Sequence, residues 1–291
     1  MMPTLTTNQN ITMPALIYGT AWKKERTADL VEMAILSGFR GIDTACQPKH
    51  YEEPLVGEAL VRLAAGGIGR EELFLQTKFT PLSGQDPKQI PYDPNAALEV
   101  QVEQSFKTSQ QNLKTDYVDS LVLHSPLFPY ANLSTVWSAM EKIYLSGGTR
   151  QLGISNCYDV ELLKRLYRDA EVKPSVVQNR FYDQSGYDIE LRAWCDEVGI
   201  LYQSFWSLTA NPHILASREF FALTQEYNKT EAQILYRYLN HIGIVPLIGS
   251  TSQKHITEDL DIFSFELKAD EITAISSLLF DPQILHDSDV R

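Results

Sequence analysis

Short apolar runs alternate with longer amphipathic stretches along almost the whole chain of 291 residues. The apolar runs resemble buried strands in length and composition, and the stretches between them carry apolar residues at helical spacing. Strands are predicted over 15–18, 41–43, 73–78, 118–124, 151–155, 176–179, 201–204 and 245–248. Helices are predicted over 27–37, 54–64, 95–113, 133–146, 160–169, 189–198, 231–239 and 255–263. This alternation indicates repeated βα units and favours a closed (β/α)8 barrel.

The pattern runs to the carboxyl end without a break that would separate domains. A further helix is predicted over 270–279, where acidic residues at the start complement the helix dipole, and a short polar tail follows over 281–291. A chain of this length with 44% hydrophobic residues can bury one large core. We therefore expect a single domain over 1–291, with the barrel over 10–280.

Charge and hydropathy narrow the possible partners. The 37 acidic residues outnumber the 25 basic ones, so the formal net charge is −12. Such a charge repels nucleic acid and anionic membrane surfaces, and neither is an expected partner. No apolar run approaches the roughly 20 residues of a membrane span, and the start of the chain lacks the basic-then-apolar pattern of an export signal.

The cysteines favour a reducing compartment. Cys46, Cys157 and Cys195 are few, odd in number and widely spaced, which argues against a disulfide framework and against a zinc site. We therefore expect a soluble, cytoplasmic protein without a metal site. No pattern in the chain specifies an oligomeric state.

Four ionisable residues lie at or just beyond the carboxyl ends of three predicted strands. Asp43 and Tyr51 belong to the run GIDTACQPKHY, Lys78 closes LFLQTK, and His124 lies in SLVLHSP. Singly, each residue has an ordinary structural use, since Asp often caps turns and a lone His among apolar residues is more often core. In a parallel barrel, however, all strands point their carboxyl ends at one face, so these four side chains are expected to converge.

Convergence of these groups would suit the reduction of a carbonyl. The carboxylate of Asp43 can hold Lys78 charged, and the ammonium beside a phenol is expected to lower the Tyr51 pKa from its reference value of about 10. Tyr51 would then donate a proton to the carbonyl oxygen. A neutral His124 would orient or polarise that oxygen.

These motifs together resemble the catalytic tetrad of the aldo-keto reductases, and the resemblance covers nearly the whole chain. It implies a (β/α)8 TIM barrel that reduces aldehydes and ketones with a nicotinamide cofactor, usually NADPH, bound extended across the barrel mouth. No Gly-x-Gly-x-x-Gly turn follows a predicted strand, so the sequence gives no support to a Rossmann site.

The resemblance also implies a set of cofactor-binding residues. In GISN and VVQN, Ser155, Asn156 and Gln178 match the residues that bind the carboxamide, and in YQSFWSL, Phe205 matches the aromatic residue on which the nicotinamide stacks. The loop and helix start in PLIGSTSQKHITEDL resemble the segment that holds the adenosine phosphates. The remaining implied contacts are Gly19, Thr20, Asp43, Trp206, Leu208, Gly249, Ser250, Thr251, Ser252, His255, Glu258 and Asp259.

The chain departs from the family pattern in two places. Tyr51 follows Asp43 about three residues later than usual, because CQPKH lengthens the loop, and its neighbour His50 is an alternative candidate. Gly249 stands where a lysine or arginine is common, and His255 stands where an arginine is common. Because of these two positions, the choice between NADPH and NADH stays open. The resemblance favours NADPH.

The expected substrate is a small carbonyl compound. Aromatic side chains in the loops after the first, fourth and seventh strands would form an apolar pocket beside Tyr51 and His124. These residues are Trp22, Phe128, Tyr130 and Trp206. Two other functions stay open at this point: an aldolase that forms a Schiff base on Lys78, and a cofactor-binding regulatory or scaffold subunit.

Overall fold

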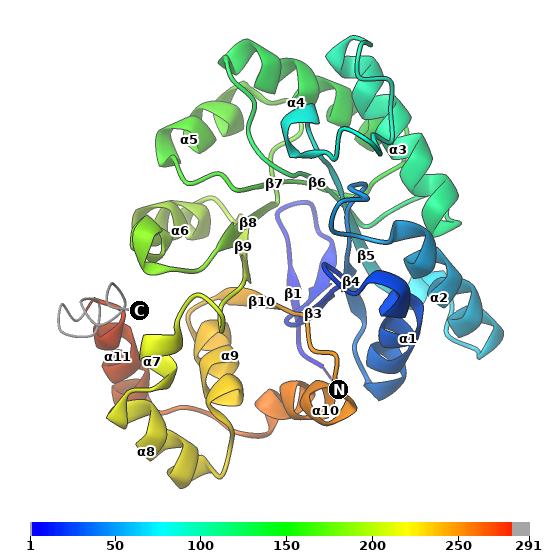
Figure 1. Ribbon diagram of the computed structural model, residues 1–291. Helices are drawn as coiled ribbons and strands as arrows, with labels where there is room; N and C mark the ends of the chain where they lie inside the picture. Colours follow the sequence, from blue (N-terminus) through cyan, green and yellow to red (C-terminus); the bar gives the residue numbers. More distant parts are fainter. Residues whose placement is uncertain (1, 281–291) are drawn as a thin grey trace.

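The computed structural model describes residues 2–280, and in it eight parallel strands close into a barrel (Figure 1). The strand order around the barrel is β10-β3-β4-β5-β6-β7-β8-β9. Its strands are β3 (Ile17–Gly19), β4 (Gly41–Asp43), β5 (Phe74–Phe79), β6 (Ser120–Leu123), β7 (Leu152–Ser155), β8 (Val176–Arg180), β9 (Leu201–Phe205) and β10 (Ile244–Ile248). The predicted (β/α)8 barrel is therefore confirmed.

An outer ring of helices surrounds these strands (Figure 1). The predicted helices are α1 (Thr27–Ser37), α2 (Glu53–Ala65), α3 (Leu98–Leu113), α4 (Tyr130–Leu145), α5 (Val160–Asp169), α6 (Ile189–Glu197), α9 (Glu231–His241), α10 (Gln253–Leu260) and α11 (Ala269–Leu278). Short 3₁₀ helices are η1 (Lys24–Arg26), η2 (Arg70–Glu72), η3 (Leu82–Gly84), η4 (Asp183–Asp188) and η5 (Asp261–Ser264). The predicted tail, 281–291, lies outside the described residues.

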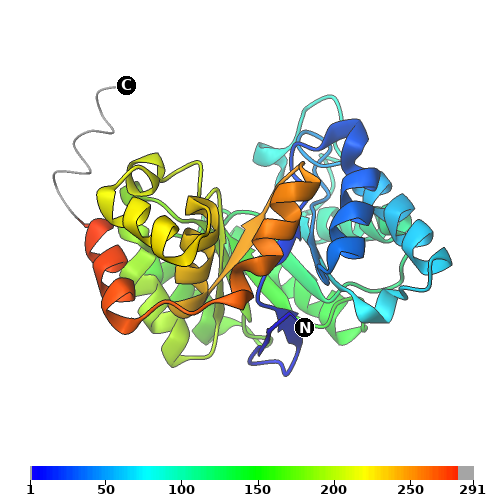
Figure 2. The same ribbon diagram turned by 90° about the horizontal axis from the view of Figure 1, so that it is seen from below.

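Several elements were not predicted. Strands β1 (Thr4–Thr6) and β2 (Thr12–Pro14) form an antiparallel hairpin, and α7 (Pro212–Leu215) and α8 (Arg218–Tyr227) precede α9. Figure 2 shows the hairpin at one end of the barrel, beside the N-terminus. Met13 of this hairpin packs with the inward-facing residues Ile17, Phe74, Val176 and Val245. The hairpin therefore closes the apolar floor of the barrel.

A polar layer lies above this floor. Alternate residues of a strand face the same side of the sheet, so on β5, β8 and β9 the residues two positions beyond the floor also point inward. These residues are Gln76, Gln178 and Gln203, and their side-chain amides are hydrogen-bonded to one another at 2.8 Å. The barrel thus changes from apolar to polar in the direction of its carboxyl-terminal mouth.

No helix within residues 2–280 is both long and apolar enough to cross a membrane.

The packing of α2 against α3 leads to a test of the fold near Tyr51. A Cβ at Gly57 would lie 1.9 Å from the carbonyl oxygen of Asn112, which belongs to the backbone of α3. Gly57→Ala should therefore lower the free energy of unfolding by about 1–3 kcal/mol, although alanine favours helices more than glycine does. Urea unfolding followed by circular dichroism measures this difference.

Val61→Ala is the matched control, because Val61 lies on the same helix and is 51% exposed. It should change the free energy of unfolding by no more than about 0.5 kcal/mol. Equal stabilities of the two variants would contradict the close approach of α2 and α3.

Candidate active site

A buried ion pair connects the ends of β4 and β5. Lys78 Nζ donates hydrogen bonds to both carboxylate oxygens of Asp43, at 2.7 and 2.6 Å, and to the carbonyl oxygen of Thr44 at 2.9 Å. Asp43 is 2% exposed and Lys78 is 1% exposed. Burial lowers the pKa of Lys78, and the nearby Asp43 carboxylate opposes that shift. All three ammonium hydrogens therefore have acceptors.

Tyr51 and His124 lie beside this pair, so the four residues converge. The Lys78 Nζ atom is 5.1 Å from the centroid of the Tyr51 ring. The ring centroids of Tyr51 and His124 are 6.0 Å apart. His124 Nδ1 lies 2.7 Å from the Thr80 hydroxyl. Burial, with the positive charge of Lys78, holds the pKa of His124 well below its usual value, so the imidazole is neutral at pH 7.

The pKa of Tyr51 shifts in the direction opposite to the one expected. Burial of the ring, and then the negative charge of Asp43, raise the pKa of the phenol above its usual value. The expected decrease relied on the ammonium of Lys78, but that group donates its hydrogens to Asp43 and Thr44. Tyr51 therefore keeps its proton at neutral pH.

The lengthened loop also brings His50 next to the site. The His50 ring stacks against Trp22, with 3.9 Å between centroids and a 36° tilt, and the Trp22 amide donates to the His50 carbonyl at 2.7 Å. His50 Nδ1 is buried without a hydrogen-bond partner within residues 2–280. His50 and Tyr51 line the same cavity as Asp43 of the ion pair.

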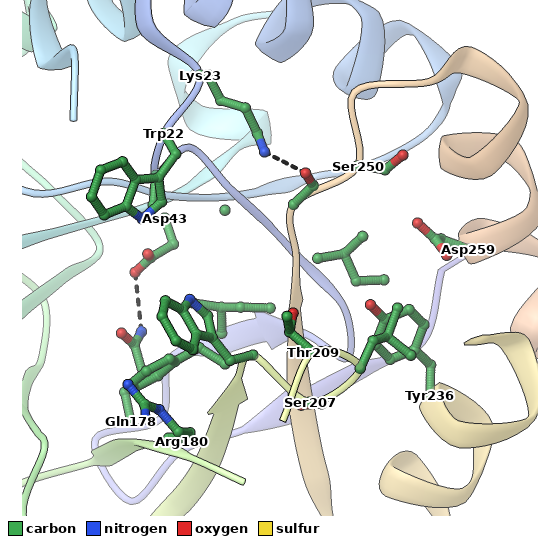
Figure 3. Close-up of a pocket in the computed structure, with 18 of the residues that line it drawn as sticks. Trp22, Lys23, Asp43, Gln178, Arg180, Ser207, Thr209, Tyr236, Ser250 and Asp259 are labelled. Carbon is green, nitrogen blue, oxygen red and sulfur yellow. Dashed lines mark hydrogen bonds between the residues drawn. The ribbon is translucent and has the colours of Figure 1, made fainter. Parts of the chain in front are cut away.

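Asp43, His50, Tyr51 and His124 line a cavity of about 910 Å³, part of which Figure 3 shows around Asp43. Most of the residues implied for the cofactor or substrate line this cavity. They are Gly19, Trp22, Asp43, Tyr51, His124, Ser155, Asn156, Gln178, Phe205, Trp206, Leu208, Gly249, Ser250, His255, Glu258 and Asp259. The cavity therefore joins residues from several strand ends into one elongated site.

Comparison with known proteins identifies the family of this barrel. The family model described as "Aldo/keto reductase family" matches residues 15–279. The chain belongs to the aldo/keto reductase family. The resemblance seen in its motifs is therefore confirmed.

Individual aldo/keto reductases and other relatives match over most of their length. A glyoxal reductase of Bacillus subtilis is 31% identical, with 87% of this chain and 84% of the relative aligned. An NADPH-dependent alpha-keto amide reductase of Saccharomyces cerevisiae is 30% identical, with 94% and 89% aligned. A solved aldo/keto reductase structure from Brucella melitensis has a TM-score of 0.81 at 28% identity, over 96% of this chain and 100% of that one.

Two aromatic residues expected in the substrate pocket lie elsewhere in this aldo/keto reductase. Phe128 is 71% exposed and does not line the cavity. Tyr130 begins α4, donates its hydroxyl hydrogen to Asp169 at 2.9 Å and packs under the guanidinium of Arg165 at 3.6 Å. The loop after β6 therefore directs Tyr130 toward α5 rather than toward the barrel mouth.

Three residues implied for the cofactor lie just outside the cavity lining. Thr20 is buried and donates its hydroxyl hydrogen to the carbonyl of Asp43 at 2.9 Å. The carbonyl of Thr251 accepts from Arg26 at 3.4 Å, and the amide of Ser252 donates to the Ser250 hydroxyl at 3.3 Å. These contacts brace the loops on which the lining residues lie.

Two cations in the cavity were missed by the sequence reasoning. Lys23 donates to the carbonyl of Gly249 and so bridges the loops after β3 and β10, as Figure 3 shows. Arg180 lies at the end of β8, beside Gln178 in the same view. A signal for Arg180 was present, because it follows Gln178 by two residues on one strand and must share its face.

The implied carboxamide-binding residues are held by the protein's own groups. Gln178 donates its amide hydrogens to Asp43 at 3.1 Å and to Gln203 at 2.8 Å. The Ser155 hydroxyl donates to the Gln178 carbonyl at 2.7 Å, and the Asn156 amide donates to the His124 carbonyl at 2.8 Å. Their positions are thus fixed relative to the ion pair. Residues 2–280 contain no cluster of three His, Cys, Asp or Glu side chains suited to a metal.

The opposite end of the cavity is acidic. Figure 3 shows Asp259, Tyr236 and Ser250 on the side away from Gln178 and Arg180. Burial, and then the charge of Glu258, raise the pKa of Asp259 to about 7. An aspartate in an unfolded chain has a pKa of about 3.9. Between these two pKa values, the folded protein holds a proton on Asp259 that the unfolded chain has lost.

This difference predicts a pH-dependent stability. Between pH 4 and pH 7 the folded state holds more protons than the unfolded state, so the contribution of Asp259 to the free energy of unfolding falls as the pH rises. The total fall is about 1.4 kcal/mol for each unit of pKa shift. Asp259→Asn removes the ionisation. The free energy of unfolding of this variant, minus that of the wild type, should grow from pH 4 to pH 7 and level off above pH 7. Urea unfolding at pH 5, 6, 7 and 8 measures the gain.

Glu25→Gln controls for the loss of one negative charge, since Glu25 is exposed and outside the cavity. Its effect should not follow the same pH course. A gain for Asp259→Asn that stays constant across this range would contradict the buried, protonated carboxyl.

Proposed function

We propose that the protein reduces aldehydes or ketones to alcohols with NAD(P)H, with NADPH preferred and Tyr51 as the general acid. The main support is that Asp43, Tyr51 and His124 line one cavity, with Lys78 paired to Asp43 beside Tyr51. The names of the two relatives, a glyoxal reductase and an NADPH-dependent alpha-keto amide reductase, agree with a carbonyl substrate.

The lining of the cavity fits a nicotinamide dinucleotide. Ser155, Asn156 and Gln178 line the cavity and offer side-chain oxygens as acceptors for a carboxamide, and Phe205 offers an aromatic face for a planar ring. Lys23 places a cation at Gly249 for a phosphate. When bound, the reduced nicotinamide supplies a hydride to the carbonyl carbon.

Tyr51 supplies the proton that completes the alcohol. Its raised pKa keeps the phenol protonated until a substrate oxygen accepts the proton. The transfer leaves a negative charge on Tyr51, which the ammonium of Lys78, 5.1 Å from the ring centroid, stabilises until solvent returns a proton. Lys78 and Asp43 therefore act as positioning and electrostatic groups.

His124 orients the same oxygen. A neutral imidazole that contacts Thr80 through Nδ1 leaves Nε2 for the substrate. A donor aimed at the carbonyl oxygen stabilises the charge that develops there during reduction. Since the imidazole is neutral, it orients the oxygen without competing with Tyr51 as the acid.

The aldolase alternative receives no support from Lys78. A Schiff base needs an uncharged amine with access to the substrate. Lys78 gives its hydrogens to Asp43 and Thr44 and does not line the cavity.

The acid assignment predicts the effect of Tyr51→Phe. Loss of the hydroxyl should lower kcat for aldehyde reduction by about 10² to 10⁴-fold, because general acid catalysis contributes about that much. Binding of NADPH should persist, since the ring stays in place. Oxidation of NADPH at 340 nm measures turnover, and fluorescence titration measures binding.

Tyr144→Phe controls for removal of a phenol elsewhere, because the Tyr144 hydroxyl contacts Gln9, far from the cavity. It should leave kcat within about twofold. His50→Ala tests the neighbouring candidate. If His50→Ala abolished turnover while Tyr51→Phe kept it, the acid would be His50.

The cation at Gly249 predicts how the cofactor binds. NADPH should bind more tightly than NADH, and Lys23→Met should raise the Kd for NADPH about tenfold, as expected for loss of a charge-assisted contact. Lys24→Met is the matched control, since Lys24 is exposed and does not line the cavity. Equal effects of the two variants would show that only the net charge matters.

A further inference from the structure

Arg180 occupies the uppermost inward-facing position of β8. Val176 on this strand packs in the barrel floor, and Gln178 donates to Asp43 at 3.1 Å. A strand rises about 3.3 Å per residue and alternates its faces, so Arg180 points to the barrel mouth about 6.6 Å beyond Gln178. It pairs in register with Phe205 of β9 and lines the cavity.

The guanidinium of Arg180 lies over two aromatic rings. It lies 4.4 Å from the centroid of the Trp206 ring and 5.2 Å from that of Tyr182. Its side chain forms no ion pair and no hydrogen bond within residues 2–280, and its Nε atom is buried without a partner. The two rings attract the positive charge but offer no acceptor to the N–H groups of the guanidinium.

Arg180 is a cation of the cavity lining on the side opposite Asp259. Glu231, Glu258 and Asp259 line the cavity, and Figure 3 shows Asp259 on the side opposite Arg180. Asp43, which accepts from Gln178 one layer below Arg180, has its charge matched by Lys78. A planar guanidinium with free N–H groups binds carboxylate and phosphate oxygens in pairs.

We propose that Arg180 binds an oxyanion at the barrel mouth, supplied either by a carboxylate on the substrate or by a phosphate of the cofactor. Arg180 and Tyr51 line the same cavity, so the oxyanion and a carbonyl held at Tyr51 would share it. A substrate carboxylate would make the preferred substrates oxo acids rather than uncharged aldehydes. This part of the proposal rests on the proposed reductase function.

The first arm of the test compares 4-carboxybenzaldehyde with benzaldehyde at saturating NADPH. If the substrate supplies the oxyanion, Arg180→Gln should raise the KM for 4-carboxybenzaldehyde about tenfold or more and leave benzaldehyde within about twofold. Arg180→Lys keeps the positive charge but loses the paired N–H groups of the guanidinium. Its KM for 4-carboxybenzaldehyde should therefore lie between those of the wild type and Arg180→Gln. Arg168→Gln is the control, since Arg168 pairs with its neighbour Asp169 outside the cavity.

The second arm measures the Kd for NADPH by fluorescence titration of the same variants. If a cofactor phosphate supplies the oxyanion, Arg180→Gln should raise this Kd about tenfold, and both aldehydes should be affected equally at limiting NADPH. Changes below about twofold in both arms would overturn the proposal.

Binding without turnover separates this proposal from the reductase function. Trp206 lies against Arg180, so its fluorescence reports a carboxylate at this position. If the wild type turned over neither aldehyde, the proposed function would fail. Titration with 4-carboxybenzaldehyde and with NADPH would still test Arg180, because both ligands should bind the wild type more tightly than Arg180→Gln under the matching arm.

Discussion

The buried ion pair between Asp43 and Lys78 is the interaction on which the site depends. Desolvation of either charge costs several kcal/mol, and only a close partner with further hydrogen bonds offsets that cost. The pair meets this condition, because Lys78 Nζ contacts both Asp43 oxygens and the Thr44 carbonyl. It fixes a positive charge beside Tyr51 and helps to keep His124 neutral. The charges of the pair thus add to the effect of burial on the pKa of both groups that would meet a substrate oxygen.

The polar layer inside the barrel supports this pair from below. Gln76 and Gln178 both donate to Asp43, at 2.8 and 3.1 Å, and both also donate to Gln203 at 2.8 Å. Buried amides are stable only when their donors and acceptors are matched, and here each bond also restricts a neighbouring side chain. Gln178 therefore connects the carboxylate of the ion pair to the part of the cavity suited to a carboxamide. A substitution of Gln76, Gln178 or Gln203 should therefore also alter the hydrogen bonds of the other two residues and of Asp43.

Sequence reasoning predicted the features that follow from strand direction and missed those that depend on tertiary contacts. The barrel, and the convergence of Asp43, Lys78 and His124, follow from apolar runs and their carboxyl ends, which are local properties. The sign of the Tyr51 pKa shift was wrong because it depends on the burial of the ring and on the charge of Asp43 beside it, which are tertiary properties. Tyr130 was expected at the mouth, but the direction of a loop residue depends on packing with α5. The hairpin β1–β2 has only three residues in each strand, too few for a clear alternation.

The cations of the cavity explain how an acidic protein can hold an anionic ligand. The formal net charge of −12 disfavours approach of an anion from a distance, but salt screens distant charges more strongly than the partly buried charges of a cavity. Gly249 has no basic side chain, yet Lys23 from the loop after β3 reaches its carbonyl and restores a cation there. Arg180 enters from β8 in the same way. Because all strand ends of the barrel open on one face, a charge absent from one loop can be supplied by another. Comparison of the Gly249 motif alone does not reveal Lys23, because the two residues lie more than 200 positions apart in the chain.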